Sequence, residues 1–431
     1  MTTGVAGPLL LKSRQRLTLR CAQMVHGGLC VAHPEDGFTV LVDGAIPGEL
    51  VEAELRFRKK RTWFATVRSV LEPAPERIGA PCPYVLECGG CQWQHIAYER
   101  QLELKREIVR DALRREHVSI PKIDVFGMDD PWRYRWRGEF HVVPGEHGVR
   151  DAGLGFNRAR SWRPIAVDDC LIHNDTITSS LPLLRDLIHA GGRDDLQTLH
   201  VTVGDEGREL MLRSTPRGAL DDGAVDAAAA RLTGERRLST DSTTLQWRGH
   251  VYRVTPETFI QVNWRQMDVL YERALRGLGD CHGLRIVDAY AGAAILATHL
   301  ATIGADVICV ESNRAAARMG VLNARVNDVA DRVRFIASLV ERALPQLREL
   351  HVDRVLLDPP RAGCGGEVTG WLALAGPERV VYVSCDPATL ARDLHVLVAS
   401  GPYAVDSIDV VDMFPQTYHV ETVVTMTRRA R

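Results

Sequence analysis

The residue best suited to covalent chemistry is Cys385, which follows a run of β-branched and aromatic residues. Residues 380–383 predict a short strand buried on both faces, and Ser384, Cys385, Asp386 and Pro387 end it abruptly. A thiol at the carboxyl end of a parallel strand lies where ligands bind in an open α/β sheet. Asp386 and Pro387 are typical of a helix start, whose dipole favours a thiolate. These features predict a nucleophile; a small buried apolar cysteine is the alternative.

A carboxylate late in the chain is a candidate proton acceptor. Residues 412–424 predict a strand, and the two-residue repeat of a strand places His419 and Glu421 on one of its faces. A carboxylate beside a reacting carbon can remove its proton. Glu421 is therefore the candidate base.

The C-terminal part, from about residue 256, alternates predicted strands and helices, which indicates a doubly wound parallel sheet. Its first strand is expected over residues 284–288 and its second over residues 306–311. Glu311 lies nineteen positions after Gly292, where an acidic residue at the end of the second strand commonly holds ribose hydroxyls. This spacing predicts an adenosine-containing cofactor, although a solvated strand end is the alternative.

The loop after the first strand narrows the choice of cofactor. It holds Tyr290 and Gly292 but no GxGxxG motif, so a pyrophosphate dinucleotide fits badly. S-adenosylmethionine carries a sulfonium cation and no phosphate, so a looser turn near Asp288 and Glu311 suits it. A later strand, residues 354–358, ends at Asp358 and enters a rigid Pro-Pro loop with Arg361 where amine-methylating enzymes have an aromatic residue, which indicates a different target.

Clustered cysteines predict a metal centre. Cys82, Cys88 and Cys91 form a CxxxxxCxxC array with two glycines inside it, and Cys170 is the best candidate for a fourth ligand. Two close thiols and a distant last one favour a [4Fe-4S] cluster. A structural zinc ion and packed thiols without metal are the alternatives.

Composition excludes several classes of protein. The chain of 431 residues is long enough for two or three domains, and its formal net charge of -2 gives no overall attraction to nucleic acid. No window is apolar enough for a membrane span, and residues 1–12 lack the pattern of a secretory signal. We therefore expect a cytoplasmic, monomeric protein that does not bind membranes.

Local basic runs indicate contact with RNA instead. Predicted short strands at residues 17–25, 37–42, 49–56 and 62–70 suggest a small barrel of the oligonucleotide-binding kind, and residues 56–64 interleave five cations with three aromatics. Beyond a predicted helix over residues 97–116, residues 132–137 alternate rings and arginines as in a strand, and residues 157–163 form another basic run. Solvated charged surface is the alternative for each run.

Six motifs then carry a resemblance to a known family. They are residues 259–263, Asp288 with Gly292, Glu311, residues 358–361, residues 384–387 and residues 414–421. Together they resemble the RNA 5-methyluridine methyltransferases, in the family's order and over nearly the whole chain. The resemblance implies a class I α/β methyltransferase domain, an N-terminal TRAM barrel and the [4Fe-4S] cluster of the branch that acts on ribosomal RNA.

The resemblance also implies roles for single residues. Cys385 would add to carbon 6 of a uracil, and Glu421 would remove the proton left on carbon 5 after methyl transfer. The cofactor positions that match the family are Gln261, Tyr290, Gly292, Glu311 and Asp358. The implied domains are a barrel at residues 10–72, a central iron-sulfur and RNA-binding domain at residues 73–255 and a catalytic domain at residues 256–431.

Two departures from the family pattern bear on activity. Ala294 replaces a glycine near the cofactor, so its methyl group is expected to crowd the methionine moiety or to shift the turn. Asp386 replaces the usual Asn after the nucleophile, and its charge is expected to raise the pKa of Cys385. A binding protein that kept the fold and lost turnover is therefore the alternative to an enzyme, and a transfer RNA methyltransferase is the alternative within the enzymes.

Overall fold

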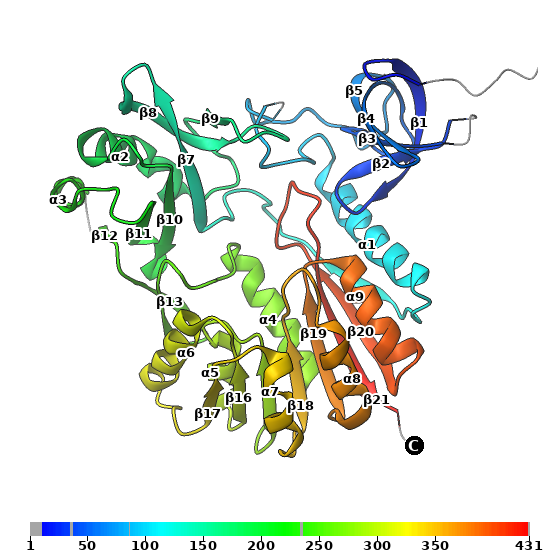
Figure 1. Cartoon of the computed structure of the whole chain (residues 1–431), viewed down its shortest axis with the longest axis vertical. Coiled ribbons are helices and arrows are strands. Elements are labelled where there is room, and N and C mark those ends of the chain that lie inside the picture. Colours follow the sequence, from blue (N-terminus) through cyan, green and yellow to red (C-terminus); the bar gives the residue numbers. More distant parts are fainter. Residues whose placement is uncertain (1–10, 35–37, 86, 233–235, 430–431) are drawn as a thin grey trace, which may run out of the picture. The chain divides into compact units, whose positions relative to one another are not determined.

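The computed structural model of the chain describes residues 11–34, 38–85, 87–232 and 236–429 (Figure 1). Residues 1–10, which hold most of the stretch examined for a secretory signal, and residue 37, at the start of an expected strand, lie outside these ranges. No described helix is long and apolar enough to cross a membrane. The chain forms two compact units: Met1–Val85, Cys91–Val109 and Phe414–His419 in one, and Leu86–Gly90, Arg110–Met413 and Val420–Arg431 in the other.

The first unit contains a closed barrel whose strands follow the order β1-β2-β3-β5-β4. Its strands are β1 (Arg16–Val25), β2 (Leu29–Ala32), β3 (Thr39–Asp43), β4 (Leu50–Lys59) and β5 (Thr62–Glu72). Buried Val51, Ala53 and Leu55 alternate with more exposed glutamates along β4, so one face of the strand forms the barrel core. The predicted barrel is thus confirmed, and only the four-residue β2 was missed.

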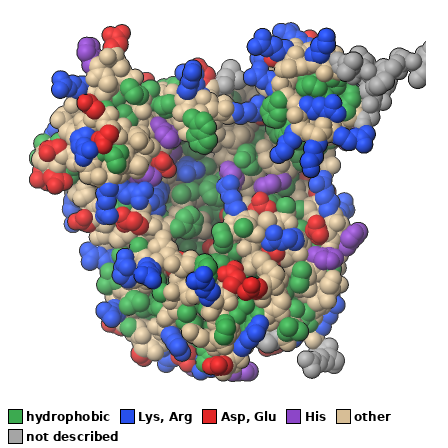
Figure 2. All heavy atoms as spheres, viewed as in Figure 1, with side chains coloured by type: hydrophobic (Ala, Val, Ile, Leu, Met, Phe, Trp, Pro, Cys, Tyr) green, Lys and Arg blue, Asp and Glu red, His purple; other side chains and the backbone are tan. Residues whose placement is uncertain are grey.

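In the basic hairpin between β4 and β5, one of the three aromatic rings expected to stack on RNA bases is buried instead. Trp63 is 8% exposed and packs in the barrel core, because the alternation of β5 turns it inward. Phe57 and Phe64 instead stack at 4.6 Å between ring centroids, with Phe57 half exposed. The cations of residues 56–61 are exposed, and Figure 2 shows Lys and Arg side chains gathered on the barrel.

The predicted helix is confirmed as α1 (Tyr98–Arg115), and its first part holds the segment Phe414–His419 within the first unit. Gln101 donates to the side-chain oxygen of Gln416 at 3.0 Å and accepts from its backbone N–H at 3.0 Å. Lys105, which is fully buried, donates to the carbonyl of Phe414 at 3.0 Å. The last turn before the strand of Glu421 is therefore fixed to a helix more than 300 positions earlier.

The second unit contains a six-stranded sheet in the order β12-β11-β10-β7-β8-β9. Its strands are β7 (Arg137–Gly145), β8 (Gly148–Asn157), β9 (Pro164–Ala166), β10 (Thr198–Gly204), β11 (Glu209–Thr215) and β12 (Arg237–Ser239). The helices α2 (Asp175–Gly191) and α3 (Asp222–Ala230) contribute leucines and isoleucines to its core. The hairpin of β13 (Thr243–Trp247) and β14 (His250–Val254) follows.

The expectation of a strand with rings on one face and arginines on the other over residues 132–137 was wrong. The regular strand begins only at Arg137, and Arg133 has a positive φ of 52°. Tyr134 is fully buried, and Arg133 forms two hydrogen bonds to the carboxylate of Asp169 at 2.6 and 2.8 Å. Internal packing and ion pairing therefore occupy part of a segment that pattern alone assigned to RNA.

The second unit also contains the predicted doubly wound sheet, with eight strands in the order β17-β16-β15-β18-β19-β21-β20-β6. The strands are β6 (Ile123–Phe126), β15 (Arg285–Ala289), β16 (Asp306–Val310), β17 (Val333–Ile336), β18 (Arg354–Leu357), β19 (Arg379–Ser384), β20 (Tyr403–Val411) and β21 (Glu421–Arg428). Strands β15 to β19 are parallel, and β21 runs antiparallel to both of its neighbours. The edge strand β6 was not predicted.

Helices surround this sheet, as Figure 1 shows. They are α4 (Trp264–Leu278), α5 (Ile295–Thr302), α6 (Arg314–Val326), α7 (Val340–Arg348), α8 (Gly365–Ala375) and α9 (Pro387–Leu394). The order reverses at β15, where β16 lies on one side and β18 on the other. In such sheets the ligand crevice forms at the carboxyl ends of the strands beside this reversal.

A buried ion pair braces the barrel. Glu49 is fully buried and accepts from Arg77 at 2.5 and 2.7 Å and from the N–H groups of Ile46 and Ala74. Burial alone would raise the pKa of Glu49, but Arg77 and the two amides outweigh it and lower this pKa. The ionised carboxylate therefore stabilises the fold above its unfolded pKa, and this contribution is lost as the pH falls through the lower folded value.

Replacing Glu49 by Gln should destabilise the barrel by roughly 2–4 kcal/mol, because Arg77 is left without its counter-charge. Hydrogen exchange of the barrel amides, followed by mass spectrometry, measures the effect locally. The control is Glu72→Gln, which removes an exposed partner of Arg20 and should leave exchange nearly unchanged. Equal protection in both variants would contradict the assigned role of the buried pair.

Candidate active site

The predicted site residues converge on the carboxyl edge of the eight-stranded sheet. Asp288 lies near the end of β15, and Glu311, Asp358 and Cys385 directly follow β16, β18 and β19. Because the carboxyl ends of parallel strands share one edge, the topology alone brings these residues together. Glu421 begins β21, whose antiparallel direction starts that strand at the same edge.

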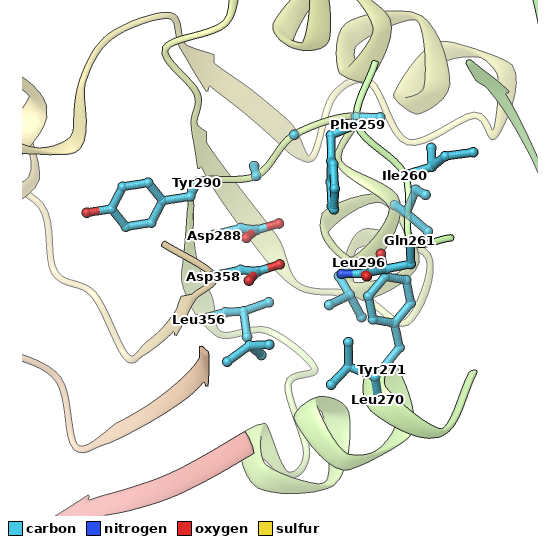
Figure 3. Close-up of a pocket in the computed structure, with 15 residues that line it drawn as sticks. Phe259, Ile260, Gln261, Leu270, Tyr271, Asp288, Tyr290, Leu296, Leu356 and Asp358 are labelled. Atoms are coloured by element: carbon cyan, nitrogen blue, oxygen red, sulfur yellow. The ribbon is translucent and has the colours of Figure 1, made fainter. Parts of the chain in front are cut away.

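A cavity with about 570 Å³ of empty volume, partly open to solvent, lies at this edge beside β15 and β18. Its lining includes Gln261, Tyr271, Asp288, Tyr290, Gly292 and Asp358. In Figure 3 the carboxylates of Asp288 and Asp358 point to the side of Gln261, and the ring of Tyr290 points away from them. The arrangement gives a mainly apolar pocket that contains two acids, which suits a ligand that carries both apolar surface and positive charge.

Glu311 holds the loop of this pocket. Its carboxylate accepts from the N–H of Gly292 at 2.8 Å and from that of Asn313 at 2.6 Å. Tyr290 and Gly292 have positive φ values of 68° and 55°, so the loop turns sharply after β15. The acidic residue at the end of the second strand therefore fixes the turn over which a cofactor would lie.

The expected crowding of the pocket by Ala294 is not observed. Ala294 is fully buried, adopts the left-handed conformation with φ 57° and precedes α5. A methyl group built on Gly320 of α6 would come within 3.1 Å of the Ala294 methyl group, whereas the cavity lining includes its neighbours Ala293 and Ile295 and not Ala294. The methyl group thus packs against α6, at a backbone cost of about 1–2 kcal/mol for a left-handed alanine.

Register places Cys385 beside Glu421. Strands β19 and β21 pair antiparallel, with Ser384 opposite Thr422 at the end of the ladder. Continuing that register by one residue sets Cys385 opposite Glu421, and directly opposed residues project from the same face. Cys385 is partly exposed, whereas Glu421 is buried.

The electrostatics of the thiol differ from the expectation of a stabilised thiolate. Burial, Glu421 and Asp358 raise the pKa of Cys385 to about 11, and Arg361 only partly opposes them. Asp386 caps α9 as predicted, and its carboxylate accepts from the N–H groups of Ala388 and Thr389. The predicted helix start is therefore correct, but burial and two nearby carboxyl groups raise the thiol pKa nonetheless.

The pKa values of three carboxyl groups of the site are raised. Burial and the neighbouring Asp358 and Glu311 raise the pKa of Asp288 to about 8, and burial raises the pKa of Asp358 to about 7. Burial and Asp358 also raise the pKa of Glu421 well above its usual range. A bound cation would offset these shifts, because it stabilises the ionised carboxylates.

The loop after β18 is fixed to α9. Thr389 donates to the carbonyl of Arg361 at 3.0 Å, and Arg392 donates to the carbonyl of Ala362 at 2.9 Å. Buried Asp393 accepts from the N–H of Cys364 at 2.8 Å and from the hydroxyl of Tyr382 at 2.7 Å. Asp358 and Cys385, at the start of these two segments, are therefore held in a fixed relation.

Sequence reasoning gave no site role to two residues that the structure places here. Arg361 is an electrostatic neighbour of both Cys385 and Glu421, and it lowers the pKa of each. Its place after two prolines was a sequence feature that could have indicated this. Tyr271 lines the cavity from α4, and a single tyrosine on a helix carries no comparable pattern.

His419 lies elsewhere than expected. It precedes β21, which begins at Glu421, and it belongs to the first unit, where its ring contacts those of Phe414 and Tyr418. The strand repeat therefore does not relate His419 to Glu421.

The four predicted ligand cysteines are partly exposed and form no disulfide. Cys82 and Cys91 belong to the first unit, and Cys88 and Cys170 belong to the second. The Cys88 sulfur accepts from the N–H of Gly90 at 3.4 Å, and the Cys170 sulfur lies 3.1 Å from Nδ1 of His173. Among the residues that the structure describes, no three His, Cys, Asp or Glu side chains are grouped closely enough to hold a metal ion.

Comparison with known proteins identifies relatives over the whole chain. Residues 226–429 match the family described as tRNA (uracil-5-)-methyltransferase. The chain is 34% identical to an RNA methyltransferase of Gloeobacter violaceus, over 98% of each chain. It is also 34% identical to the 23S rRNA (uracil(1939)-C(5))-methyltransferase of Alkalilimnicola ehrlichii, over 97% of this chain and 98% of the relative.

A solved structure shares the fold. The tRNA (uracil-54, C5)-methyltransferase of Pyrococcus abyssi, in complex with S-adenosyl-L-homocysteine, superimposes with a TM-score of 0.70 at 23% identity. The match covers 95% of this chain and 100% of that chain. The predicted architecture of barrel and doubly wound sheet is thus found in a protein of known structure.

The electrostatic neighbours of Cys385 can be tested by alkylation with iodoacetamide. Glu421→Gln removes a negative neighbour and should lower the thiol pKa, so Cys385 should react faster, by about two- to ten-fold at a given alkaline pH. Arg361→Met removes the opposing cation and should slow the reaction. Mass spectrometry of the Cys385 peptide, at pH values up to about 11, gives the rates. Unchanged rates in both variants would contradict the register given for Cys385 and Glu421.

Proposed function

This chain belongs to the family of S-adenosylmethionine-dependent RNA uracil-C5 methyltransferases, and within that family we propose that it methylates a uridine of 23S ribosomal RNA through a covalent adduct with Cys385. The observations that support the mechanism are the antiparallel register of β19 and β21, which continued by one residue pairs Cys385 with Glu421, and the electrostatic influence of Glu421 on the thiol. Relatives that act on 23S ribosomal RNA, at 31% and 34% identity over nearly the whole chain, support the substrate.

The proposed chemistry begins with the thiol. Carbon 5 of a uracil is a weak nucleophile, so the Cys385 thiolate adds to carbon 6, and the displaced electron pair makes carbon 5 an enolate carbon. Bound S-adenosylmethionine supplies the methyl group to carbon 5. Glu421 then removes the remaining proton from carbon 5, and the C6–S bond breaks as the ring double bond re-forms. Cys385 leaves as a thiolate, ready for another round.

The raised pKa of Glu421 fits its proposed role as a base, whereas the raised pKa of Cys385 opposes formation of the thiolate. Burial, Glu421 and Asp358 raise the pKa of Cys385 to about 11, so the thiol is mostly protonated at neutral pH. Arg361 opposes that shift, and a cationic cofactor beside Asp358 would weaken the repulsion that Asp358 exerts. A carboxylate whose pKa is raised is also a stronger base, which suits Glu421 for the removal of a carbon-bound proton.

The cofactor site is assigned to the cavity at β15 and β18. Gln261, Tyr290, Gly292 and Asp358 line it, and Glu311 holds its loop through the N–H of Gly292. Asp288 and Asp358 supply negative charge for the sulfonium group. Gln261 and Asp358 are also assigned to contact the uracil.

The central cysteines are proposed as the ligands of a [4Fe-4S] cluster. The donor set of Cys82, Cys88, Cys91 and Cys170 fits by chemistry, the N–H of Gly90 faces the sulfur of Cys88, and Nδ1 of His173 lies 3.1 Å from the sulfur of Cys170. Because their side chains belong to two compact units, cluster binding requires that they converge. A structural zinc ion remains the competing occupant.

The domain limits follow the same proposal. A TRAM barrel at residues 10–72, a central domain at residues 73–255 and a catalytic domain at residues 256–431 are supported by the separate barrel, six-stranded sheet and eight-stranded sheet. The edge strand β6 is the exception, since it lies in the central range and pairs with β20. We further propose a monomer that acts on RNA in the cytoplasm.

Covalent trapping tests the proposed reaction. With S-adenosylmethionine and a transcribed 23S ribosomal RNA fragment that contains 5-fluorouridine, the protein should form a stable adduct, because fluorine at carbon 5 cannot be removed by Glu421. Cys385→Ala should form none, and Cys281→Ala, a buried cysteine outside the site, should form as much as the native protein. Glu421→Gln should accumulate adduct on ordinary RNA.

Denaturing gel electrophoresis with labelled RNA measures these adducts. Methylation that persists in Cys385→Ala would overturn the nucleophile. RNA binding with neither adduct nor methyl transfer would favour the alternative, a binding protein that has lost turnover. Methylation of transfer RNA and not of ribosomal RNA would show that the substrate is transfer RNA, as in the other branch of the family.

Iron and sulfide analysis after anaerobic purification tests the cluster. We expect about four irons and four sulfides per chain, as a [4Fe-4S] cluster requires. Cys88→Ser and Cys170→Ser should each lose most of the iron, whereas Cys281→Ser should keep it. Stoichiometric zinc without iron would contradict the cluster.

A further inference from the structure

We propose that the turn at residues 158–163 is a stacking site for an unpaired nucleotide of the RNA substrate, separate from the uridine that reacts at Cys385. The inference rests on the proposed function only in taking RNA as the substrate. The turn joins β8 to β9 in the second unit, and its exposed ring is Trp162.

The exposure of Trp162 is unusual within this chain. It is 92% exposed, whereas the other tryptophans of the chain, all in described segments, are buried or half-buried. Burial of an indole side chain away from water is favourable, and packing into a core would provide that stabilisation. Here the ring contributes little to folding, which indicates a surface made for contact.

The turn that carries Trp162 is held by hydrogen bonds. Arg158 donates its N–H to the carbonyl of Arg163 at 2.9 Å, and Ser161 donates to the carbonyl of Arg158 at 3.0 Å. The segment at Gly89 also holds the start of the turn, because the N–H of Gly89 donates to the carbonyl of Asn157 at 2.9 Å. A ring on a braced turn loses little conformational entropy when a ligand stacks on it.

An open hollow lies between this turn and Gly89 and Gly90. It has about 910 Å³ of empty volume, and the ring of Phe156 contributes to its lining together with Trp162. The two glycines offer no side chain, so the hollow stays wide on that side. A flat, partly apolar ligand the size of a nucleobase fits such a space.

Charge selects a nucleotide as the occupant. Arg158 and Arg160 line the hollow, Arg163 is exposed beside it, and no acidic side chain belongs to the lining. Glu87 pairs with Arg158 and balances one of these charges. Cations for phosphates next to a ring for bases are the combination by which proteins hold single-stranded nucleic acid.

Binding measurements with two RNA probes test the site in the full-length protein. The probes are oligouridine and a 23S ribosomal RNA fragment, and the variants are Trp162→Ala, Trp162→Phe and Arg160→Ala. The control is Leu374→Ala, which removes an apolar side chain of α8 that is 80% exposed. Iron content of each variant, compared with the native protein, shows whether the adjoining cysteine segment is intact.

Trp162→Ala should weaken binding of both probes by about ten-fold or more, in line with the loss of a stacked base. Trp162→Phe should recover most of the affinity. Arg160→Ala should weaken binding, and the dependence of its affinity on salt concentration should not become steeper. Leu374→Ala should bind as the native protein does. Oligouridine should also quench tryptophan emission in the native protein, and Trp162→Ala should lose that quenching.

The outcomes separate this site from the proposed reaction. If Trp162→Ala binds both probes and methylates RNA as the native protein does, the stacking site is overturned. If the native protein methylates no RNA but Trp162→Ala still weakens oligouridine binding, the stacking site stands and the proposed function fails. Quenching by an acidic peptide such as oligoglutamate, and not by oligouridine, would overturn the nucleotide as occupant.

Discussion

The antiparallel pairing of β21 with β19 is the constraint on which the site depends. A purely parallel sheet would bring only strand ends to the ligand edge, and every side chain there would follow a strand. Because β21 enters in the opposite direction, its first residue, Glu421, stands beside the residue that follows β19, Cys385. A thiol and a carboxylate separated by 36 positions of sequence thus become neighbours through one register.

This closeness has an electrostatic cost. Burying carboxyl groups together disfavours their ionised forms, and the pKa values of Asp288, Asp358 and Glu421 all rise for that reason. The same charges oppose the thiolate of Cys385. A site with this surplus of acidic groups is completed by a cation, which is the property that S-adenosylmethionine brings.

Much of the fold and the site was predictable because strand ends carry local patterns. Asp288, Asp358 and Cys385 each close a short run of aliphatic residues, and Asp386 with Pro387 marks a helix start that the structure confirms. Patterns that depend on tertiary burial were less informative. Trp63 and Tyr134 belong to basic runs in the sequence, yet both turn inward, since a periodic pattern does not reveal which neighbouring layer will cover a ring.

Other features needed three dimensions. The edge strand β6 is four residues long and pairs with a strand more than 280 positions later, so no local signal separates it from a loop. The helix start was expected to lower the thiol pKa and Asp386 to raise it. The pKa rises, but the causes are burial and the approach of Glu421 and Asp358 rather than Asp386. The position of the Ala294 methyl group, against α6 and not in the cavity, likewise follows from packing between helices.

The segment before Glu421 links the base to the first unit by the chain itself. Phe414–His419 is held there by Gln101 and Lys105 of α1, with two hydrogen bonds between Gln101 and Gln416 and one from buried Lys105 to Phe414. The chain then passes from His419 in one unit through Val420 to Glu421 in the other. One residue, Val420, therefore separates the anchored segment from the proposed base, so a local helix contact and a distant strand meet within three positions of the sequence.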